Sequence, residues 1–466
     1  MAYQSINPYN GELLQTFDQL TDSQVEGALA KADSAFQHVW SKASFPDRAQ
    51  VVSRAASLML ERKETLARLA AIEMGKRISE GRDEVELSAA ILQYYADHAE
   101  TFLAPQDIET RVGDAHLEFS PLGVLIGVQP WNFPYYQLAR FVAPNLMAGN
   151  TLLVKHSSGV PQCALGFQQL LIDAGAPCGV YTNLFASSDQ VGSLIDDPRT
   201  KGIALTGSEQ AGESLASRAG KNLKRSTMEL GGSDAFIVLE DCDLELAVKM
   251  AVLGRIGNAG QTCIGAKRFI VVGPRAEKFL AAFRDALAQL KPGDPLDEST
   301  TLGPLASETA LNLLLKQARE AVAHGARLFS GGNRIGNRGA FMEPTILTDV
   351  ADDNPAFRQE FFGPVALFFA ARDEEEAIAI ANNSPYGLGG SVYTSDIGHG
   401  KQIASRIETG MVFVNYPFVS APDLPFGGIK RSGYGKELSS LGIQEFVNKK
   451  LVWAANARTQ THKRRP

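Results

Sequence analysis

The chain has 466 residues, 44% of them hydrophobic, so it is long enough for two or three domains with sizeable cores. Lys and Arg number 45 against 52 Asp and Glu, and the net charge of −7 argues against nucleic acid or an anionic membrane as the main partner. The segment MAYQSINPYN lacks the basic and apolar regions of a signal peptide, and no long apolar run suited to crossing a membrane occurs, so we expect a soluble cytoplasmic protein.

Helical patterns dominate the first part of the chain. Thr21 and Gln24 have the spacing of a capping box, which predicts the start of a helix. The apolar residues that follow recur every three or four positions and are expected on one buried face: Val25, Leu29, Ala32, Phe36 and Val39. A second helix of this kind is expected after Asp47.

From Gly123 onward, short β-rich runs alternate with helical stretches such as PQCALGFQQLLIDAGA. The runs are GVLIGV, TLLVK, VYTNLF, GIALTG and DAFIVL. Strands that alternate with helices indicate a parallel, doubly wound sheet. After Asp234 a second α/β series begins, with a helix over 275–290 and strands near KRFIVV, FMEPTIL, GGSVYT and GMVFVN, which predicts a second domain.

Ligands of doubly wound sheets bind beyond the carboxyl ends of the strands, and four candidate residues lie at such ends. They are Asn132, Lys155, Gly207 and Glu229. The turn GSEQAG suits a phosphate at a helix N-terminus, but it lacks the lysine of a P-loop and the middle glycine of GxGxxG. Taken singly, each candidate also has an ordinary structural interpretation, as a turn, cap or surface residue.

The four cysteines show no CxxC pair and no His at zinc-ligand spacing, so we expect neither a disulfide framework nor a metal site. Cys263 lies in GQTCIGAKR, between a predicted helix and the strand FIVV. On this stretch alone it can be a buried structural cysteine or a nucleophile that works with a base elsewhere in the chain.

Seven motifs together resemble those of the aldehyde dehydrogenase superfamily, in the family's order and over essentially the whole chain. They are PWNFP at 130–134, VKHSS at 154–158, LTGS at 205–208, MELGGSD at 228–234, GQTCIGAKR at 260–268, QEFFGPV at 359–365 and PFGGIKRSG at 425–433. The resemblance implies an α/β fold with a Rossmann-type cofactor domain, an α/β catalytic domain and a small β oligomerisation arm.

By this resemblance, the cofactor domain covers 1–102 and 122–231 and the catalytic domain covers 232–446. The oligomerisation arm and the C-terminal strand cover 103–121 and 447–466. The stretch DIETRVGDAHLEFS alternates like an edge strand, and an exposed apolar strand near the C-terminus needs a partner. We therefore expect a homodimer or homotetramer.

The resemblance assigns Cys263 as the nucleophile that attacks an aldehyde carbonyl. The side-chain amide of Asn132 and the backbone N–H of Cys263 are expected to hold the resulting oxyanion. Glu229 matches the base that activates water to hydrolyse the thioester. Its presence implies release of a free carboxylate rather than transfer of the acyl group to coenzyme A.

The implied cofactor is NAD or NADP. Glu360 matches the residue that binds the nicotinamide ribose, Phe362 the residue beside the nicotinamide, and Lys155 the lysine at the adenosine ribose. Further matching cofactor contacts are Trp131, Gly207, Ser208 and Leu230. Ser158 stands where strongly NAD-preferring members carry a glutamate, and because serine neither repels nor specifically attracts a 2′-phosphate, the choice between the two cofactors stays open.

Arg140 lies at the same place as the substrate-carboxylate arginine of succinate-semialdehyde dehydrogenases, and Ser420 matches a serine that helps to bind that carboxylate. A guanidinium suits bidentate contact with a carboxylate, although a surface arginine is the structural alternative. The second arginine of some of these enzymes falls at Gly257, with Arg255 nearby. We expect a small-molecule aldehyde, first succinate semialdehyde, then glutarate semialdehyde or a broad range of aliphatic aldehydes.

Two other classes of function stay in view. A cysteine-dependent thioester hydrolase or acyltransferase would also use Cys263, Asn132 and Glu229, but it would have no use for a nicotinamide site. A non-catalytic protein could keep the fold, although loss of the nucleophile or the base would then be expected, and both are present.

Overall fold

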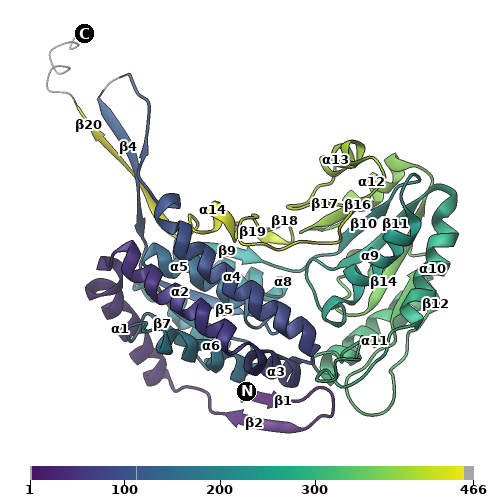
Figure 1. Ribbon diagram of the computed structural model, residues 1–466, viewed down its shortest axis with the longest axis horizontal. Coiled ribbons are helices and arrows are strands. Elements are labelled where there is room, and N and C mark those ends of the chain that lie inside the picture. The colour runs from purple at the N-terminus through teal and green to yellow at the C-terminus, as the bar shows by residue number, and fades with distance from the viewer. Residues whose placement is uncertain (1–2, 112, 456–466) are drawn as a thin grey trace.

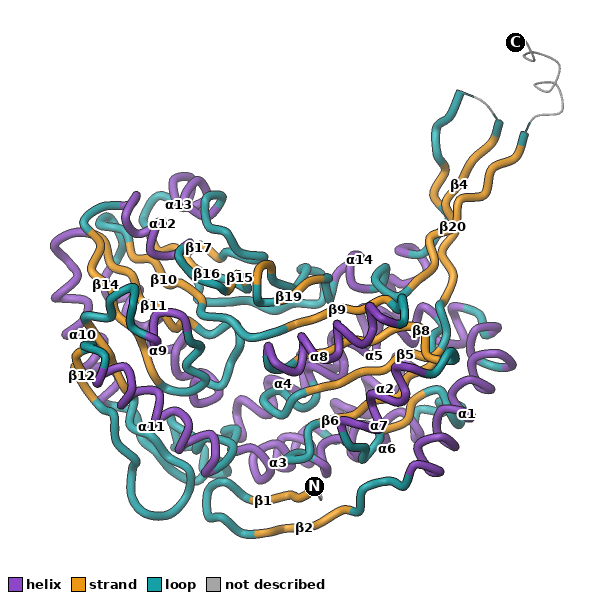
Figure 2. Tube along the Cα trace, turned by 180° about the vertical axis from the view of Figure 1, so that it is seen from behind, coloured by secondary structure: helices purple, strands orange, loops and turns teal. Residues whose placement is uncertain are grey.

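The computed structural model describes residues 3–111 and 113–455, and these form two α/β lobes with a β arm projecting from the first (Figure 1). Residues 1–2, 112 and 456–466, which the predicted domains include, lie outside the described residues. Figure 2 shows the arm from behind, with its strands extending well beyond the sheet of the first lobe.

The sheet of the first lobe has the strand order β19-β9-β8-β5-β6-β7, and its strands run parallel except for β19, which is antiparallel to β9. Its strands are β5 Val124–Gln129, β6 Thr151–His156, β7 Tyr181–Asn183, β8 Thr200–Thr206, β9 Arg225–Glu229 and β19 Gly433–Tyr434. The predicted doubly wound sheet is confirmed. However, β19 comes from the segment assigned to the second domain, so the chain returns to the first sheet near its C-terminal end.

Helices pack against the sheet of the first lobe (Figure 1). They are α1 Asp22–His38, α2 Phe45–Glu61, α3 Lys63–Met74, α4 Ile78–Phe102, α5 Tyr136–Ala148, α6 Pro161–Asp173, α7 Ser188–Asp196 and α8 Glu209–Lys221, with a 3-10 turn η1 at Trp40–Lys42. The Thr21–Gln24 capping box is confirmed, with both reciprocal hydrogen bonds present. Val39 follows the end of α1 and is 46% exposed, so its assignment to the buried face is wrong. Helix α2 begins at Phe45, ahead of Asp47, because Ser44 forms its capping box.

The sheet of the second lobe has the order β12-β13-β14-β11-β10-β16-β17 and is parallel except for β12. Its strands are β10 Asp234–Val238, β11 Ala266–Val272, β12 Arg327–Ser330, β13 Thr345–Thr348, β14 Val365–Ala371, β16 Gly390–Tyr393 and β17 Phe413–Val414. Its helices are α9 Leu244–Ile256, α10 Ala276–Ala288, α11 Glu308–Ala323, α12 Glu374–Asn382 and α13 Ile397–Ala404, with 3-10 turns η2 Gly257–Gly260, η3 Gly273–Arg275 and η4 Pro355–Arg358. The predicted second α/β unit is thus present.

The arm joins the two chain segments that were expected to meet. Strand β20 (Val447–Ala454) pairs antiparallel with β4 (Asp114–Pro121) along its whole length, and β3 (Gln106–Asp107) flanks β4. The remaining elements are the hairpin β1 Tyr3–Ile6 and β2 Leu13–Phe17, the ribbon β15 Tyr386–Gly387 and β18 Ile429–Lys430, and the short helix α14 Ser439–Gly442. The N-terminal hairpin was not expected from the sequence.

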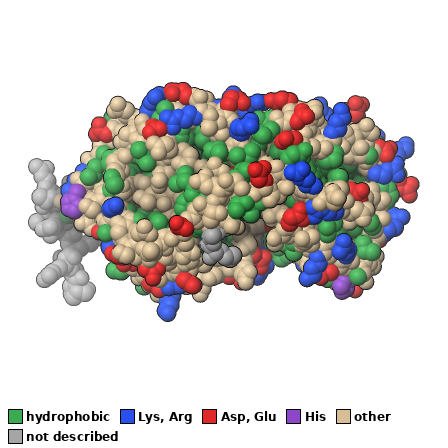
Figure 3. Space-filling model, turned by 90° about the horizontal axis from the view of Figure 1, so that it is seen from below, with side chains coloured by type: hydrophobic (Ala, Val, Ile, Leu, Met, Phe, Trp, Pro, Cys, Tyr) green, Lys and Arg blue, Asp and Glu red, His purple; other side chains and the backbone are tan. Residues whose placement is uncertain are grey.

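On the face shown in Figure 3, acidic and basic side chains are interspersed rather than gathered by sign. Within residues 3–111 and 113–455, no helix combines the length and the apolar character needed to cross a membrane.

Candidate active site

Four residues singled out in the sequence lie along one edge of the first sheet. Glu229 is the last residue of β9 and Gly207 follows β8, while Asn132 follows β5 and Lys155 is near the end of β6. Because these four strands are parallel neighbours, their carboxyl ends meet at the same edge. The structure therefore places the four residues along this one edge of the sheet.

Cys263 lines a pocket of about 470 Å³ between the lobes. It lies on the turn between η2 and β11 and is half-buried. The walls are mainly apolar and aromatic, with acidic residues from α4, and they comprise Glu80, Asp83, Glu84, Leu87, Phe133, Tyr136, Gln137, Leu253, Gly257, Asn258, Thr262, Ile264, Tyr416, Phe418, Val419, Ser420 and Phe426. Cys263 lies on a concave, mainly apolar wall, so its thiol can contact a small ligand in the pocket. A cysteine in the hydrophobic core could not do so.

Two nearby cations partly offset the effect of burial on the pKa of the Cys263 thiol. Burial raises the pKa of this thiol to about 11, and the positive charges of Arg140 and then Lys267 act to lower it. Glu360 and Asp234 act in the opposite direction. Because the thiolate is the nucleophilic form, the two cations are the groups of this chain that favour reactivity.

The side chain of Asn132 is fixed against the cysteine turn. Its Nδ2 donates to the carbonyl of Gln261 at 3.0 Å, and its Oδ1 accepts from Gln137 Nε2 at 3.0 Å. Asn258 Nδ2 in turn donates to the Asn132 carbonyl at 2.8 Å. A side-chain amide has two N–H donors, so the bond to Gln261 leaves one for an oxyanion beside Cys263.

Glu229 is a buried carboxyl group whose two oxygens have no hydrogen-bond partner among the described residues. Burial raises its pKa well above the ordinary value, and the neighbouring Glu437 raises it further, whereas Arg140 and Lys436 lower it. Such an environment moves the pKa of a carboxyl group towards the range in which it can accept a proton at neutral pH.

On the other side of the cysteine turn, Glu360 is held between the two lobes. Its Oε1 accepts from Gly232 N at 3.1 Å and pairs with Lys267 Nζ at 3.1 Å. A Cβ at Gly231 would lie 2.2 Å from Glu360 Oε2, so glycine there leaves room for the carboxylate in its present position. The rings of Phe362 and Trp131 meet edge to face with centroids 5.7 Å apart.

The other residues expected at a cofactor lie near the ends of β6 and β8. Ser208 caps α8, Gly207 N donates to the Glu229 carbonyl, and Leu230 packs over the start of α8 at Gly212. Ser158 is exposed. Burial lowers the pKa of Lys155, whose ammonium has one hydrogen bond among the described residues, at 3.4 Å to the His156 carbonyl.

Arg140 was expected on the wall of the substrate pocket, and the structure places its side chain in the protein interior. Its side chain is 1% exposed, is absent from the pocket lining in the described residues, and forms an ion pair with Glu437. Burial alone would lower its pKa, but Glu437 and Tyr136 raise it, so the guanidinium stays charged. Direct contact between Arg140 and a substrate carboxylate stays a prediction, and in the described residues its charge is paired with Glu437 and lies outside the pocket lining. Arg140 is not a surface arginine either.

Tyr136 connects Arg140 to the pocket. Arg140 Nη1 donates to Tyr136 Oη at 3.1 Å, and Tyr136 Oη is 2.6 Å from Ser420 Oγ. Both hydroxyl residues line the pocket with Cys263. The structure therefore brings Arg140 and Ser420 together, but through a tyrosine that the sequence analysis missed.

Arg255, considered as a second carboxylate ligand, is fully buried and donates to the Gly260 carbonyl, so it does not reach the pocket. Sequence reasoning also missed Glu437 and Lys267. The lysine in the apolar run AKRFIVV could have indicated a buried ion pair. A lysine is almost never fully buried unless it is paired. Glu437 had no such signal.

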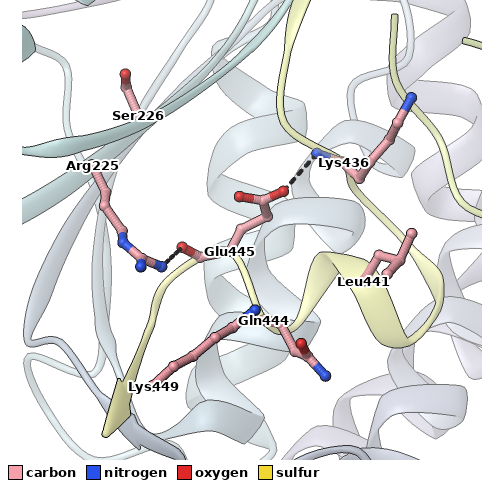
Figure 4. A pocket seen from close by; sticks show the side chains of 7 residues that line it. All are labelled: Arg225, Ser226, Lys436, Leu441, Gln444, Glu445 and Lys449. Carbon is pink, nitrogen blue, oxygen red and sulfur yellow. Dashed lines mark hydrogen bonds between the residues drawn. The ribbon is translucent and has the colours of Figure 1, made fainter.

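A second pocket, of about 380 Å³, lies at the root of the arm (Figure 4). Arg225 and Glu445 lie on facing segments there, and Arg225 Nη1 donates to the Glu445 carbonyl at 2.8 Å. Glu445 Oε1 accepts from the backbone N–H of Lys436 at 2.9 Å. No residue predicted for catalysis, cofactor or substrate lines this pocket in the described residues.

Comparison with known proteins identifies the family of this chain. The model of the Aldehyde dehydrogenase family matches residues 1–452. The chain belongs to the aldehyde dehydrogenase family. The curated relatives that it matches include proteins named succinate-semialdehyde dehydrogenase and aldehyde dehydrogenase, which favours a dehydrogenase over a thioester hydrolase or a non-catalytic protein.

Similar family members include the succinate-semialdehyde dehydrogenase [NADP(+)] of Deinococcus radiodurans, which is 48% identical over 97% of this chain and 94% of the relative. The probable succinate-semialdehyde dehydrogenase [NADP(+)] of Synechocystis is 44% identical over 98% of this chain and 100% of the relative. Among solved structures, the succinic semialdehyde dehydrogenase of Streptococcus pyogenes in complex with NADP+ superimposes with a TM-score of 0.96, at 44% identity, covering 98% of this chain and 100% of that one.

Proposed function

We propose that this aldehyde dehydrogenase oxidises succinate semialdehyde to succinate with NADP or NAD. The main observation in support is a pair of hydroxyls, Tyr136 Oη and Ser420 Oγ, on the wall of the pocket that contains Cys263. Arg140 donates to Tyr136 Oη, which polarises the hydroxyl pair so that one of the two hydroxyls can donate onward to a carboxylate. Relatives named as succinate-semialdehyde dehydrogenases support the same substrate.

In the proposed reaction, the Cys263 thiolate adds to the aldehyde carbon and forms a thiohemiacetal. The free N–H of the Asn132 amide and the backbone N–H of Cys263 hold the oxyanion, where one lost donor costs on the order of a hundred- to a thousandfold in rate. The bound nicotinamide supplies the acceptor for the hydride that leaves the substrate carbon. Glu229 then takes a proton from the water that hydrolyses the Cys263 thioester.

The residues at the sheet edge fit a dinucleotide. Glu360 is fixed at the interface of the lobes and presents Oε2 beside Gly231, where it can accept from ribose hydroxyls. The first turn of α8 offers N–H groups to a pyrophosphate beside Gly207 and Ser208. The buried ammonium of Lys155 has one hydrogen bond among the described residues, so it has N–H groups left to donate to the adenosine ribose.

We propose NADP as the preferred cofactor. Ser158 is exposed three residues after Lys155, so this end of the site carries a positive charge without a compensating carboxylate on the same segment. A dianionic 2′-phosphate is favoured by such a potential. The printed names of two relatives and of one solved structure also specify NADP.

A homo-oligomer in the cytoplasm is the proposed form of the protein. The arm projects from the first lobe, and β20 exposes Leu451 and Trp453 at 61% and 50%. Exposed apolar side chains on a projecting sheet are typical of a surface that pairs with another copy. The mass of the particle in solution tests this, because a monomer would contradict it.

A broad-specificity aldehyde dehydrogenase is the second candidate, and one observation favours it. Glu80 and Asp83 line the pocket from α4, and Asp83 is exposed. Arg77 pairs with Glu80 at 2.8 Å, but the acidic character of this wall disfavours an anionic substrate over an uncharged one.

The deciding experiment compares kcat/KM for succinate semialdehyde and butanal, which have the same chain length. We expect wild type to prefer the acid, and Ser420→Ala to lower the acid's kcat/KM by about tenfold or more, because a hydrogen bond to a charged group contributes about 1.5–3 kcal/mol. Butanal should change little. Ser405→Ala, on the exposed end of α13, is the matched control. Equal kcat/KM for both substrates in wild type would establish the broad-specificity candidate.

A further inference from the structure

Lys267 is a fully buried lysine in the interior of the protein. It is the second residue of β11, and its side chain is 0% exposed. A buried ammonium is costly unless each of its donors finds an acceptor. Lys267 Nζ has three acceptors: the carbonyl of Thr262 at 2.7 Å, the carbonyl of Cys263, and Glu360 Oε1 at 3.1 Å. These acceptors match the three N–H groups of the ammonium.

The bond to Thr262 fixes the direction of the Cys263 N–H. The Thr262 carbonyl and the Cys263 N–H belong to one planar peptide unit, and in a trans peptide they point in opposite directions. Because the ammonium holds the carbonyl, the N–H is turned to the opposite side. Gly265 N donates to the same carbonyl at 3.1 Å, so two hydrogen bonds hold the Thr262 carbonyl in this orientation.

The third bond extends to the expected cofactor carboxylate. Glu360 belongs to the segment between η4 and β14, and it is bonded to Lys267 and to Gly232 N. The ammonium of Lys267 thus connects the turn that carries Cys263 to Glu360, the carboxylate expected to bind the nicotinamide ribose. The charged groups that act on the Cys263 thiol are Lys267, Arg140, Glu360 and Asp234.

We propose that Lys267 is a positioning residue that orients the Cys263 N–H, holds Glu360 for the cofactor, and favours the Cys263 thiolate. This role goes beyond the proposed substrate, because it concerns the nucleophile and the cofactor carboxylate whatever aldehyde is oxidised. Its charge offsets that of Glu360, which otherwise disfavours the thiolate. Without the lysine, Glu360 would lose its ion pair and keep the bond from Gly232 N, and the Thr262 carbonyl would keep only the bond from Gly265 N.

The test uses the cofactor-free enzyme and measures how fast iodoacetamide alkylates Cys263 as a function of pH. Mass spectrometry of the peptide that contains Cys263 separates this thiol from Cys163, Cys178 and Cys242. In Lys267→Met we expect the pH midpoint to rise and alkylation near neutral pH to be about tenfold slower, which corresponds to one pKa unit. Dinucleotide affinity should also fall several-fold. Lys278→Met, an exposed lysine on α10, should behave as wild type.

Because Lys267→Met removes the ion pair of Glu360, it can fail to fold, and a second pair of variants covers this outcome. The double variant Lys267→Met with Glu360→Gln removes both charges, which buried sites tolerate better than removal of one. Its midpoint for Cys263 should lie above that of Glu360→Gln alone, since only the lysine differs between them. Equal midpoints in this comparison, or a folded Lys267→Met with the wild-type midpoint, would overturn the proposal.

Discussion

Arg140 and Glu437 form a buried ion pair directly behind the wall of the pocket that contains Cys263. Arg140 comes from α5, whereas Glu437 precedes α14 near the C-terminal end of the described chain. The guanidinium also lies over the rings of Phe426 and Tyr136, at 4.1 and 4.9 Å from their centroids. Its charge acts on the Cys263 thiol, on Glu229 and on Tyr136 of the pocket wall.

This pairing predicts that Arg140→Met destabilises the protein. Removal of one partner leaves Glu437 buried and unpaired, which typically costs about 3–5 kcal/mol. Replacing both partners, as Arg140→Met with Glu437→Gln, should cost less than the sum of the two single changes. Thermal unfolding of the four proteins measures this, and additive losses would show that the two charges do not depend on each other.

The same variant separates two roles for Arg140 in catalysis. Because its charge lowers the pKa of the Cys263 thiol, Arg140→Met should lower kcat/KM for butanal as well as for succinate semialdehyde. A contribution to carboxylate binding, through Tyr136 or by direct contact, would add a further loss of kcat/KM for the acid alone. The loss with butanal therefore measures the effect of the charge on the thiol, and the additional loss with the acid measures its effect on carboxylate binding.

The contrast at Arg140 shows where sequence reasoning succeeded and where it could not. Motif order predicted the α/β fold and the residues along the sheet edge, because four of the motifs, PWNFP, VKHSS, LTGS and MELGGSD, lie at the carboxyl ends of β5, β6, β8 and β9. The partner of a buried arginine depends on a distant segment, and no local pattern near Arg140 indicates Glu437. The two-residue strand β19 was invisible for the same reason, since its pairing with β9 is entirely tertiary. The hairpin β1–β2 is different, because Asn10 and Gly11 are a turn signal that could have been used.

Glu229 gives the second prediction, which concerns the hydrolysis step. Glu229→Gln should show a rapid burst of reduced cofactor followed by slow turnover, because glutamine cannot take a proton from water. In wild type, the raised pKa of Glu229 means that its deprotonated fraction grows as pH increases towards that pKa. The steady-state rate should therefore rise with pH in wild type and lose this dependence in the variant. A variant with the wild-type steady-state rate would remove Glu229 from the role of base.

The third prediction concerns cofactor choice and Ser158. This serine follows β6, and its carbonyl accepts from Gln4 N of β1 at 3.1 Å, so the backbone is fixed and a new side chain would extend from a defined position. A carboxylate there would face the end of the cofactor at which a 2′-phosphate distinguishes NADP from NAD. At an effective dielectric between that of water and that of a partly buried site, repulsion between charges about 4 Å apart amounts to about 1–4 kcal/mol.

Ser158→Glu should therefore raise the KM for NADP by about tenfold or more, since each 1.4 kcal/mol is a factor of ten, while NAD changes little. Ser158→Gln is the matched control, because it adds the same bulk without the charge, so any loss that it shares with Ser158→Glu is steric. The repulsion should also weaken as salt is added, because exposed charges are screened over about 8–10 Å at moderate ionic strength. Steady-state kinetics with both cofactors at two salt concentrations measures all three effects. If glutamate and glutamine lower NADP use equally, or if salt does not alter the difference between them, Ser158 does not face the 2′-phosphate, and the NADP preference must arise from other residues of the site.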